Sequence, residues 1–144
     1  MTDQIYIKAE RIRSIQEKGQ AQVNEGIDSE LIGIVNYGII GMIQLSLGAV
    51  SHPDLDISEA LTLYDKYAEA TPQLMLAKNH DYGEVWRNMR LSSIIDIILT
   101  KIYRTKQIED NRGQTFVSEG IEANYMDMVN YALFCLVQLA KNEQ

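Results

Sequence analysis

An internal repeat constrains the fold more than any other feature of this sequence. Residues 18–45 align without a gap on residues 112–139, and eleven of the 28 aligned positions are identical. With an offset of 93 instead of 94, the match continues upstream at Asp3/Asp96, Ile5/Ile98, Lys8/Lys101, Arg11/Arg104 and Ile15/Ile108. We therefore predict one all-α domain, a helical bundle of two helix–loop–helix units at about 2–45 and 95–139, related by a pseudo-twofold axis and joined by a helical linker.

Apolar spacing and helix-boundary signals place the expected helices, and no segment alternates as a strand would. The expected ranges are 2–18, 28–48, 57–70, 72–79, 94–110 and 121–141. Pro72 is expected to start its own helix, because proline suits the first helical position. Asp28, Asp56 and either Ser92 or Ser93 are the expected N-caps.

Composition excludes several classes of partner and site. The net charge is −7, so the chain lacks the broad basic face that binds duplex nucleic acid. Its one cysteine, Cys135, excludes an intrachain disulfide and favours a reducing, cytoplasmic setting. Residues 31–50 are uncharged and long enough to span a bilayer, but the second copy has Asp127 at the position of Gly33. We therefore expect a buried bundle helix and no membrane partner.

Three carboxylates near the start of the last expected helix form a candidate metal site. Glu119, Glu122 and Asp127 offer the oxygen ligands that Mg²⁺ or Mn²⁺ prefers. In this interpretation all three hold the metal, and Glu122 with Asp127 also acts in catalysis. The alternative is that Glu119 and Glu122 only stabilise the positive end of a helix.

The stretch from Lys78 to Arg90 occurs once and gathers cations and aromatic rings around a glycine. Tyr82 or Trp86 would stack on a base, and the cations would bind phosphates. The alternative is a buried tryptophan covered by arginine side chains. The full set of expected substrate-binding residues is Lys78, Asp81, Tyr82, Trp86, Arg87, Lys101, Arg104, Asn130 and Tyr131.

Polar residues also recur between the copies. Asn130 matches Asn36, and Gln138 matches Gln44, although these amides lie in apolar helices and need hydrogen-bond partners. Either they bind a ligand, or the two asparagines bond to each other and fix the helix register. Two pairs of cations, Lys8 with Arg11 and Lys101 with Arg104, are spaced to share a helix face, where they would bind phosphates or form surface ion pairs.

The segments KNHDYGEVWRNMR, IYRTKQIED and EANYMDMVNYAL resemble the nucleotide modification associated domain type 1 family, a small all-α family. The likeness extends over nearly the whole chain. The family's association with phage base-modification genes implies nucleotide handling. The pattern of acids is also similar, distantly, to that of MazG-type nucleoside triphosphate pyrophosphohydrolases. Those enzymes have E-x-x-E and E-x-x-D on separate helices, whereas this chain has Glu119-x-x-Glu122 followed closely by Asp127-x-x-Asn130.

The expected function is nucleotide or nucleoside triphosphate binding, by a metal-dependent pyrophosphohydrolase or by an accessory factor in nucleotide modification. The alternative is a non-enzymatic, dimerising helical module whose repeated polar residues are structural. The first unit has no counterpart of the DYG…W…R segment, so we expect the native protein to extend beyond Met1. Apolar surface left exposed there favours a homodimer.

Overall fold

The computed structural model describes residues 1–18, 24–47, 56–82, 85–111 and 118–142. Its elements are α1 (Thr2–Lys18), α2 (Asn24–Leu47), α3 (Ile57–Tyr82), the short 3₁₀ helix η2 (Val85–Asn88), α4 (Leu91–Asp110) and α5 (Ser118–Asn142). No strand occurs within these described ranges, and the all-α prediction is confirmed.

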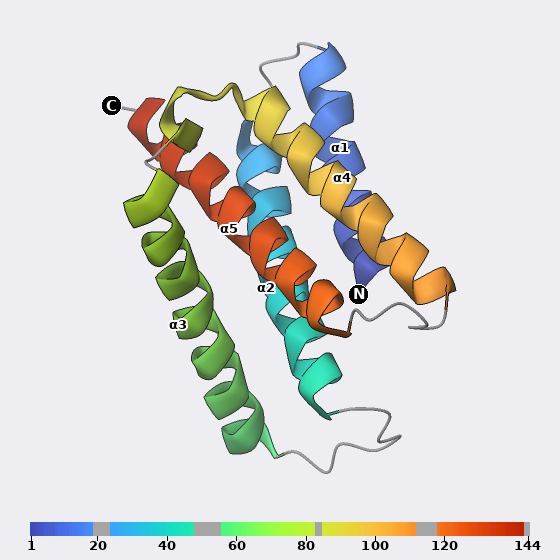
Figure 1. Cartoon of the computed structure of the whole chain (residues 1–144). Coiled ribbons are helices and arrows are strands. Elements are labelled where there is room, and N and C mark those ends of the chain that lie inside the picture. The colour runs from blue at the N-terminus through green and yellow to red at the C-terminus, as the bar shows by residue number, and fades with distance from the viewer. Residues whose placement is uncertain (19–23, 48–55, 83–84, 112–117, 143–144) are drawn as a thin grey trace.

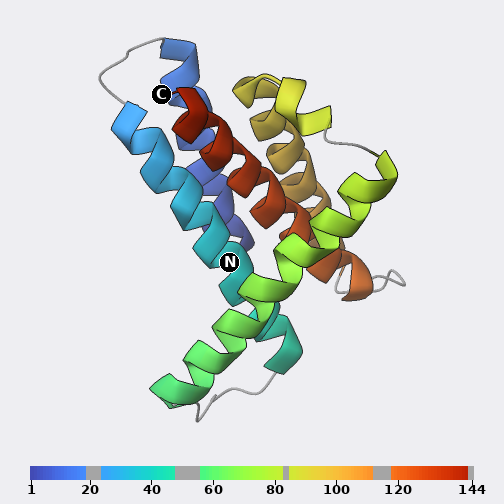
Figure 2. The same ribbon diagram turned by 90° about the vertical axis from the view of Figure 1, so that its left-hand side faces the viewer.

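Four helices form the core of the bundle, and the fifth lies outside it (Figure 1). The central pair is α2 and α5, which make the most extensive contact. Helix α1 packs against α2, α4 packs against α5, and α1 and α4 also touch each other. Helix α3 crosses the outer side of α2 and α5, as the second view shows (Figure 2). The core between the four helices is aliphatic, and its fully buried side chains include Ile5, Ile12, Leu31, Ile34, Ile98, Leu99 and Met128.

The central pair approaches closely because glycines on α2 face larger side chains on α5. A methyl group on Gly38 would lie 2.5 Å from Cγ2 of Val129, and one on Gly41 would lie 2.9 Å from the ring of Tyr125. Neither position has room for a side chain. Gly38 and Gly41 therefore serve the close packing of α2 against α5.

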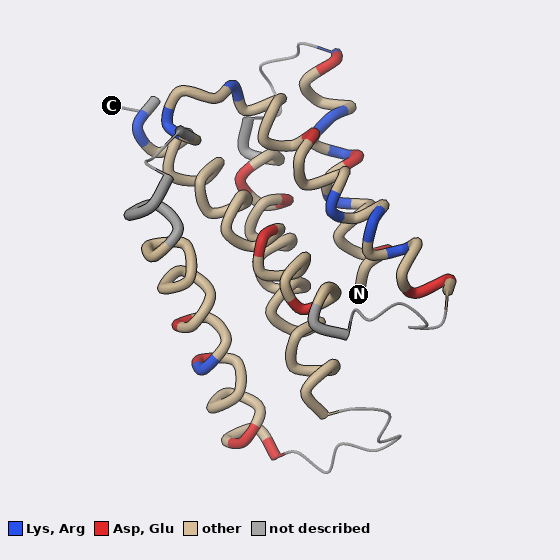
Figure 3. Tube along the Cα trace, in the orientation of Figure 1, with Lys and Arg blue, Asp and Glu red and all other residues tan. Residues whose placement is uncertain are grey.

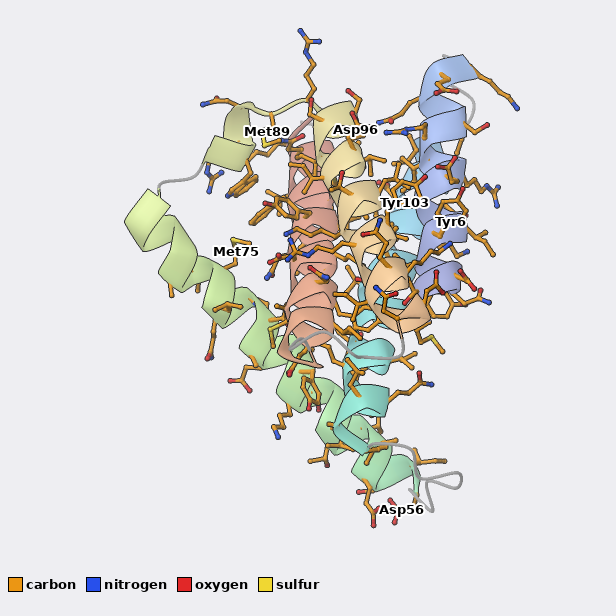
Figure 4. The ribbon with its side chains drawn as sticks, turned by 45° about the vertical axis from the view of Figure 1, so that its right-hand side comes forward. Tyr6, Asp56, Met75, Met89, Asp96 and Tyr103 are labelled. Carbon is orange, nitrogen blue, oxygen red and sulfur yellow. The ribbon has the colours of Figure 1, made fainter. Side chains whose placement is uncertain are left out.

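Helices α1 and α4 are antiparallel and joined by two ion pairs. Asp3 binds Lys106 at 3.0 Å, and Asp96 binds Arg13. Between them the rings of Tyr6 and Tyr103 meet with centroids 6.1 Å apart (Figure 4). An offset of 93 takes Asp3 to Asp96 and Arg13 to Lys106, so the two ion pairs exchange as a pseudo-twofold axis would require. The duplication stays a prediction, and this exchange is consistent with it.

One segment among the described residues, Gly26–Leu47, is long and apolar enough to cross a bilayer. A buried core helix passes the same test. In this structure the segment belongs to α2 and packs against α1, α3 and α5.

Several expected helix boundaries were wrong. Helix α3 is continuous through Pro72, where two helices were expected. Its buried residues Tyr67, Thr71 and Met75 follow at helical spacing on both sides of the proline, so packing against the bundle keeps one axis.

The caps were predicted correctly at one of three places. Asp56 caps α3, because its Oδ1 accepts the Glu59 N–H at 2.7 Å. Helix α2 already begins at Asn24, which leaves Asp28 inside it. The N-cap of α4 is Arg90, which makes no side-chain cap bond, so neither of the expected serines caps this helix.

Replacing Gly38 by alanine should lower the free energy of unfolding by about 1–3 kcal/mol, since the new methyl overlaps Val129. The matched control is Gly33→Ala on the same helix. There the nearest atom is Cε of the flexible Lys8 side chain, at 3.2 Å, and alanine is the better helix former by up to about 1 kcal/mol. Urea denaturation followed by circular dichroism measures both. Equal losses in the two variants would contradict the close α2–α5 contact.

Burial raises the pKa of the Cys135 thiol from 9.0 to about 12. The folded state therefore holds this proton more tightly than the unfolded chain. The resulting stabilisation is complete below about pH 9 and is lost as the pH rises towards 12. We expect the native thiol to resist a thiol reagent at about pH 8 and to react once urea unfolds the chain. Fast labelling of the native protein would show that Cys135 is accessible.

Candidate functional site

The second hairpin places a lysine and a carboxylate together. Nζ of Lys101 on α4 lies 3.1 Å from Oδ2 of Asp127 on α5, and the Asp127 side chain is only 14% exposed. Figure 3 shows the basic positions of α4 beside the acidic positions of α5. Both residues were predicted from the sequence, one for phosphate and one for metal. The structure brings them into direct contact.

The first hairpin has its own ion-pair cluster, which sequence reasoning missed. Glu30 on α2 is buried, and its carboxylate lies 3.2 Å from both Lys8 and Arg11 on α1. These two cations are therefore occupied by an internal carboxylate. The available signal was the position of Glu30, the last charge before the apolar run and one turn before Gly33.

The tryptophan predicted to bind a base belongs to a small core. Trp86 is 8% exposed and stacks on Phe134 with ring centroids 4.1 Å apart and planes 3° from parallel. Arg87 lies 4.6 Å from the indole centre. Met75 and Met89 complete this cluster from α3 and from the end of η2 (Figure 4). This arrangement is the alternative interpretation, a buried tryptophan covered by an arginine. A base could stack on Trp86 only by displacing Phe134 or Arg87.

Gln138 fixes the Trp86 segment to α5. Its Nε2 donates to the backbone oxygens of Trp86 at 2.9 Å and of Met89 at 3.0 Å. Its sequence mate Gln44 is exposed on α2. Of the two repeated glutamines, Gln138 therefore has a structural role, because it holds the Trp86 segment against α5.

The repeated asparagines do not bond to each other, contrary to the expected register contact. Both instead hold α3. Asn36 accepts a hydrogen bond from the Tyr64 hydroxyl at 2.6 Å, and Asn130 donates to the Thr71 carbonyl at 3.0 Å. The carbonyl and hydroxyl of α3 thus supply the partners that these amides require.

The structure brings some of the remaining predicted residues together on one helix face and separates others. Asp127, Asn130, Tyr131, Phe134 and Gln138 follow one another at helical spacing and share a face of α5.

Glu122 is half-buried, but five residues of helix place it about 140° around the axis from Asp127. Arg104 is exposed on α4. The side chains of Glu119, Lys78, Asp81 and Tyr82 lie outside the described part of the structure. Among the described side chains, no group of three metal-binding residues forms, so the predicted set of three carboxylates stays a prediction.

A shallow depression of about 430 Å³ lies elsewhere, on the surface of α3. It contains none of the predicted site residues. Its lining consists of Thr62, Asp65, Lys66, Glu69, Ala70 and Gln73.

Replacing Gln138 by leucine should release the Trp86 segment, because the two hydrogen bonds that Gln138 donates to backbone oxygens are lost, at a cost of about 1–3 kcal/mol. Trp86 is the only tryptophan, so native fluorescence reports on it directly. We expect the emission maximum to move to longer wavelength. The exposed mate provides the control, since Gln44→Leu should change stability by less than about 0.5 kcal/mol. An unchanged emission spectrum in Gln138→Leu would contradict the anchoring role.

Comparison with protein families gives a match over most of the chain. Residues 1–45 and 78–139 match the family described as nucleotide modification associated domain 1. These two ranges contain the two copies of the repeat, and the second begins at Lys78. No curated protein and no solved structure is significantly similar to the chain. The chain belongs to the nucleotide modification associated domain 1 family.

Proposed function

We propose that this protein binds a nucleotide through its phosphates at the α4–α5 face of the second hairpin, as an accessory factor in nucleotide modification. The observation that carries the proposal is the half-buried pair of Lys101 and Asp127. A lysine ammonium binds phosphate oxygen as a compact point charge. The family description supports a nucleotide as the ligand.

The first hairpin supports this choice of site by contrast. There the cations Lys8 and Arg11 already share the buried carboxylate of Glu30. In the second hairpin the carboxylate of Asp127 contacts Lys101, while Arg104, the counterpart of Arg11, is exposed on α4. Tyr131, on the same face of α5 as Asp127, is half-buried, and its ring would be the stacking surface for a base.

A divalent cation would extend the binding. Asp127 offers the carboxylate that Mg²⁺ or Mn²⁺ prefers, and such an ion would neutralise phosphate charge and release Lys101 to a phosphate oxygen. Hydrolysis of the α–β phosphate linkage is the narrower proposal, because it requires a further carboxylate to complete the metal site. Glu122 faces a different side of α5, which favours binding over catalysis.

The test is thermal unfolding of the protein with a panel of deoxynucleoside triphosphates and Mg²⁺, with pyrophosphate release measured in parallel. A ligand at about 100 times its Kd should add about 2.7 kcal/mol of stability to the native protein. Lys101→Met should weaken that ligand by about 10- to 100-fold, because a charge-assisted hydrogen bond is lost. Pyrophosphate release that disappears in Asp127→Asn would support hydrolysis.

The matched control is Lys8→Met in the first hairpin, which removes the equivalent cation while Arg11 still binds Glu30. This variant should keep the nucleotide-induced shift in melting temperature. If the control loses the shift as completely as Lys101→Met, the site is not in the second hairpin. If millimolar nucleotide stabilises none of the proteins, nucleotide binding is wrong.

The second candidate is a non-enzymatic, dimerising helical module. It is favoured by the internal hydrogen bonds of Asn36, Asn130 and Gln138. Exposed apolar side chains on α3 agree with a partner surface, notably Ile57 and Leu76. Sedimentation of the wild type as a monomer at all concentrations would remove this candidate.

A further inference from the structure

The two hairpins pack in the same register, which allows their positions to be compared one by one. The sequence match places Lys101 on Lys8, Asp127 on Gly33, Arg104 on Arg11 and Asn124 on Glu30. In the first hairpin a methyl group on Gly33 would lie 3.2 Å from the Lys8 side chain. In the second, Lys101 meets Asp127 at 3.1 Å. The lysine therefore reaches the equivalent position of the facing helix in both hairpins.

By the sequence match, Arg104 is the counterpart of Arg11 and Asn124 is the counterpart of Glu30, so we infer that Arg104 faces Asn124. In the first hairpin, Arg11 contacts the buried Glu30 carboxylate at 3.2 Å. The second hairpin has a neutral amide at that position. Its guanidinium, Arg104, is exposed and makes no ion pair with any described residue.

Asn124 is itself left incomplete. It is 5% exposed, and its Nδ2 is buried without a hydrogen-bond partner among the described atoms. A buried amide donor normally has a partner, so an empty one marks a place where an acceptor is expected. The exchange of glutamate for asparagine between the copies thus removes a carboxylate, leaves the buried Asn124 Nδ2 without an acceptor among the described atoms and leaves Arg104 exposed to solvent.

We propose that Asn124, Arg104 and Lys101 form an anion subsite that takes one phosphate group of the nucleotide, in the place that the Glu30 carboxylate occupies in the first hairpin. The inference rests on the proposed function and names the groups that would hold the phosphate. Arg104 supplies the planar, permanently charged donor that matches phosphate oxygens, and Asn124 supplies a neutral donor. Asp127 contacts Lys101 at 3.1 Å, and its carboxylate would be the ligand for a divalent cation bound beside the phosphate.

One consequence is that, of the two equivalent positions in the described hairpins, only the one at Asn124 would take a phosphate. In the first hairpin the Glu30 carboxylate itself occupies this position and contacts Lys8 and Arg11. In the second hairpin the anion would have to come from solution. The difference depends on one residue, and it is therefore reversible by substitution.

The experiment measures inorganic pyrophosphate and a deoxynucleoside triphosphate, each added alone, by the shift in melting temperature of the full chain. For the wild type at about 100 times the Kd, we expect a rise of roughly 5–10 °C with either ligand. Asn124→Glu restores the carboxylate of the first hairpin, so the melting temperature without ligand should not fall and the pyrophosphate shift should disappear. Arg104→Met changes an exposed residue and keeps the fold, and it should weaken pyrophosphate by at least about tenfold. Arg11→Met is its matched control and should keep the wild-type shift.

The outcomes separate this inference from the proposed function. If the triphosphate stabilises the wild type, Asn124→Glu and Arg104→Met equally, the subsite is wrong and nucleotide binding stands. If pyrophosphate stabilises the wild type but neither variant, and the triphosphate binds no better than pyrophosphate, the anion subsite stands and the nucleotide proposal fails. If neither ligand stabilises the wild type, both are overturned.

Discussion

The close contact between α2 and α5 determines the positions of the other helices. Gly41 allows the ring of Tyr125 to lie against the α2 backbone, and the same tyrosine reaches across to α1 and α4. Its hydroxyl bonds to Thr2 Oγ1 at 2.7 Å, and Thr2 donates onward to Glu109 at 2.6 Å. Burial raises the pKa of the Tyr125 hydroxyl, so the phenol in this chain of hydrogen bonds stays protonated and neutral. One aromatic side chain thus connects all four core helices.

The two hairpins use similar charges in different ways. The first neutralises its cations internally with Glu30, and the second presents Asp127 to Lys101 and leaves Arg104 exposed. A half-buried pair adds little net stability, because desolvation offsets most of the attraction. The second hairpin can therefore carry a polar site, while the apolar contact of α2 and α5 maintains the fold.

The sequence predicted the helices well and the tertiary partners poorly, for physical reasons. Helical periodicity and punctuation are local, which is why α1 and the Asp56 cap were predicted correctly. The continuity of α3 through Pro72 depends on packing that only the folded bundle provides. For the same reason the stacking of Trp86 on Phe134 was not visible in the pattern of residues. Within the candidate site, Lys101 was found because it recurs as Lys8 in the first copy, and Asp127 was found because it replaces Gly33. Glu30 and Asn124 were missed because they occupy matching positions with different residue types, so the position does not recur between the copies.

Helix α3 lies largely in the range 46–77, between the two segments that match the family. Asn36 and Asn130 hold this helix to the bundle, through the Tyr64 hydroxyl and the Thr71 backbone carbonyl. Tyr64 supplies the hydroxyl donor for Asn36, and Thr71 supplies a backbone carbonyl acceptor for Asn130, which any residue could provide. These two bonds therefore require of α3 only one suitably placed hydroxyl and one free carbonyl, and they place little further demand on its sequence.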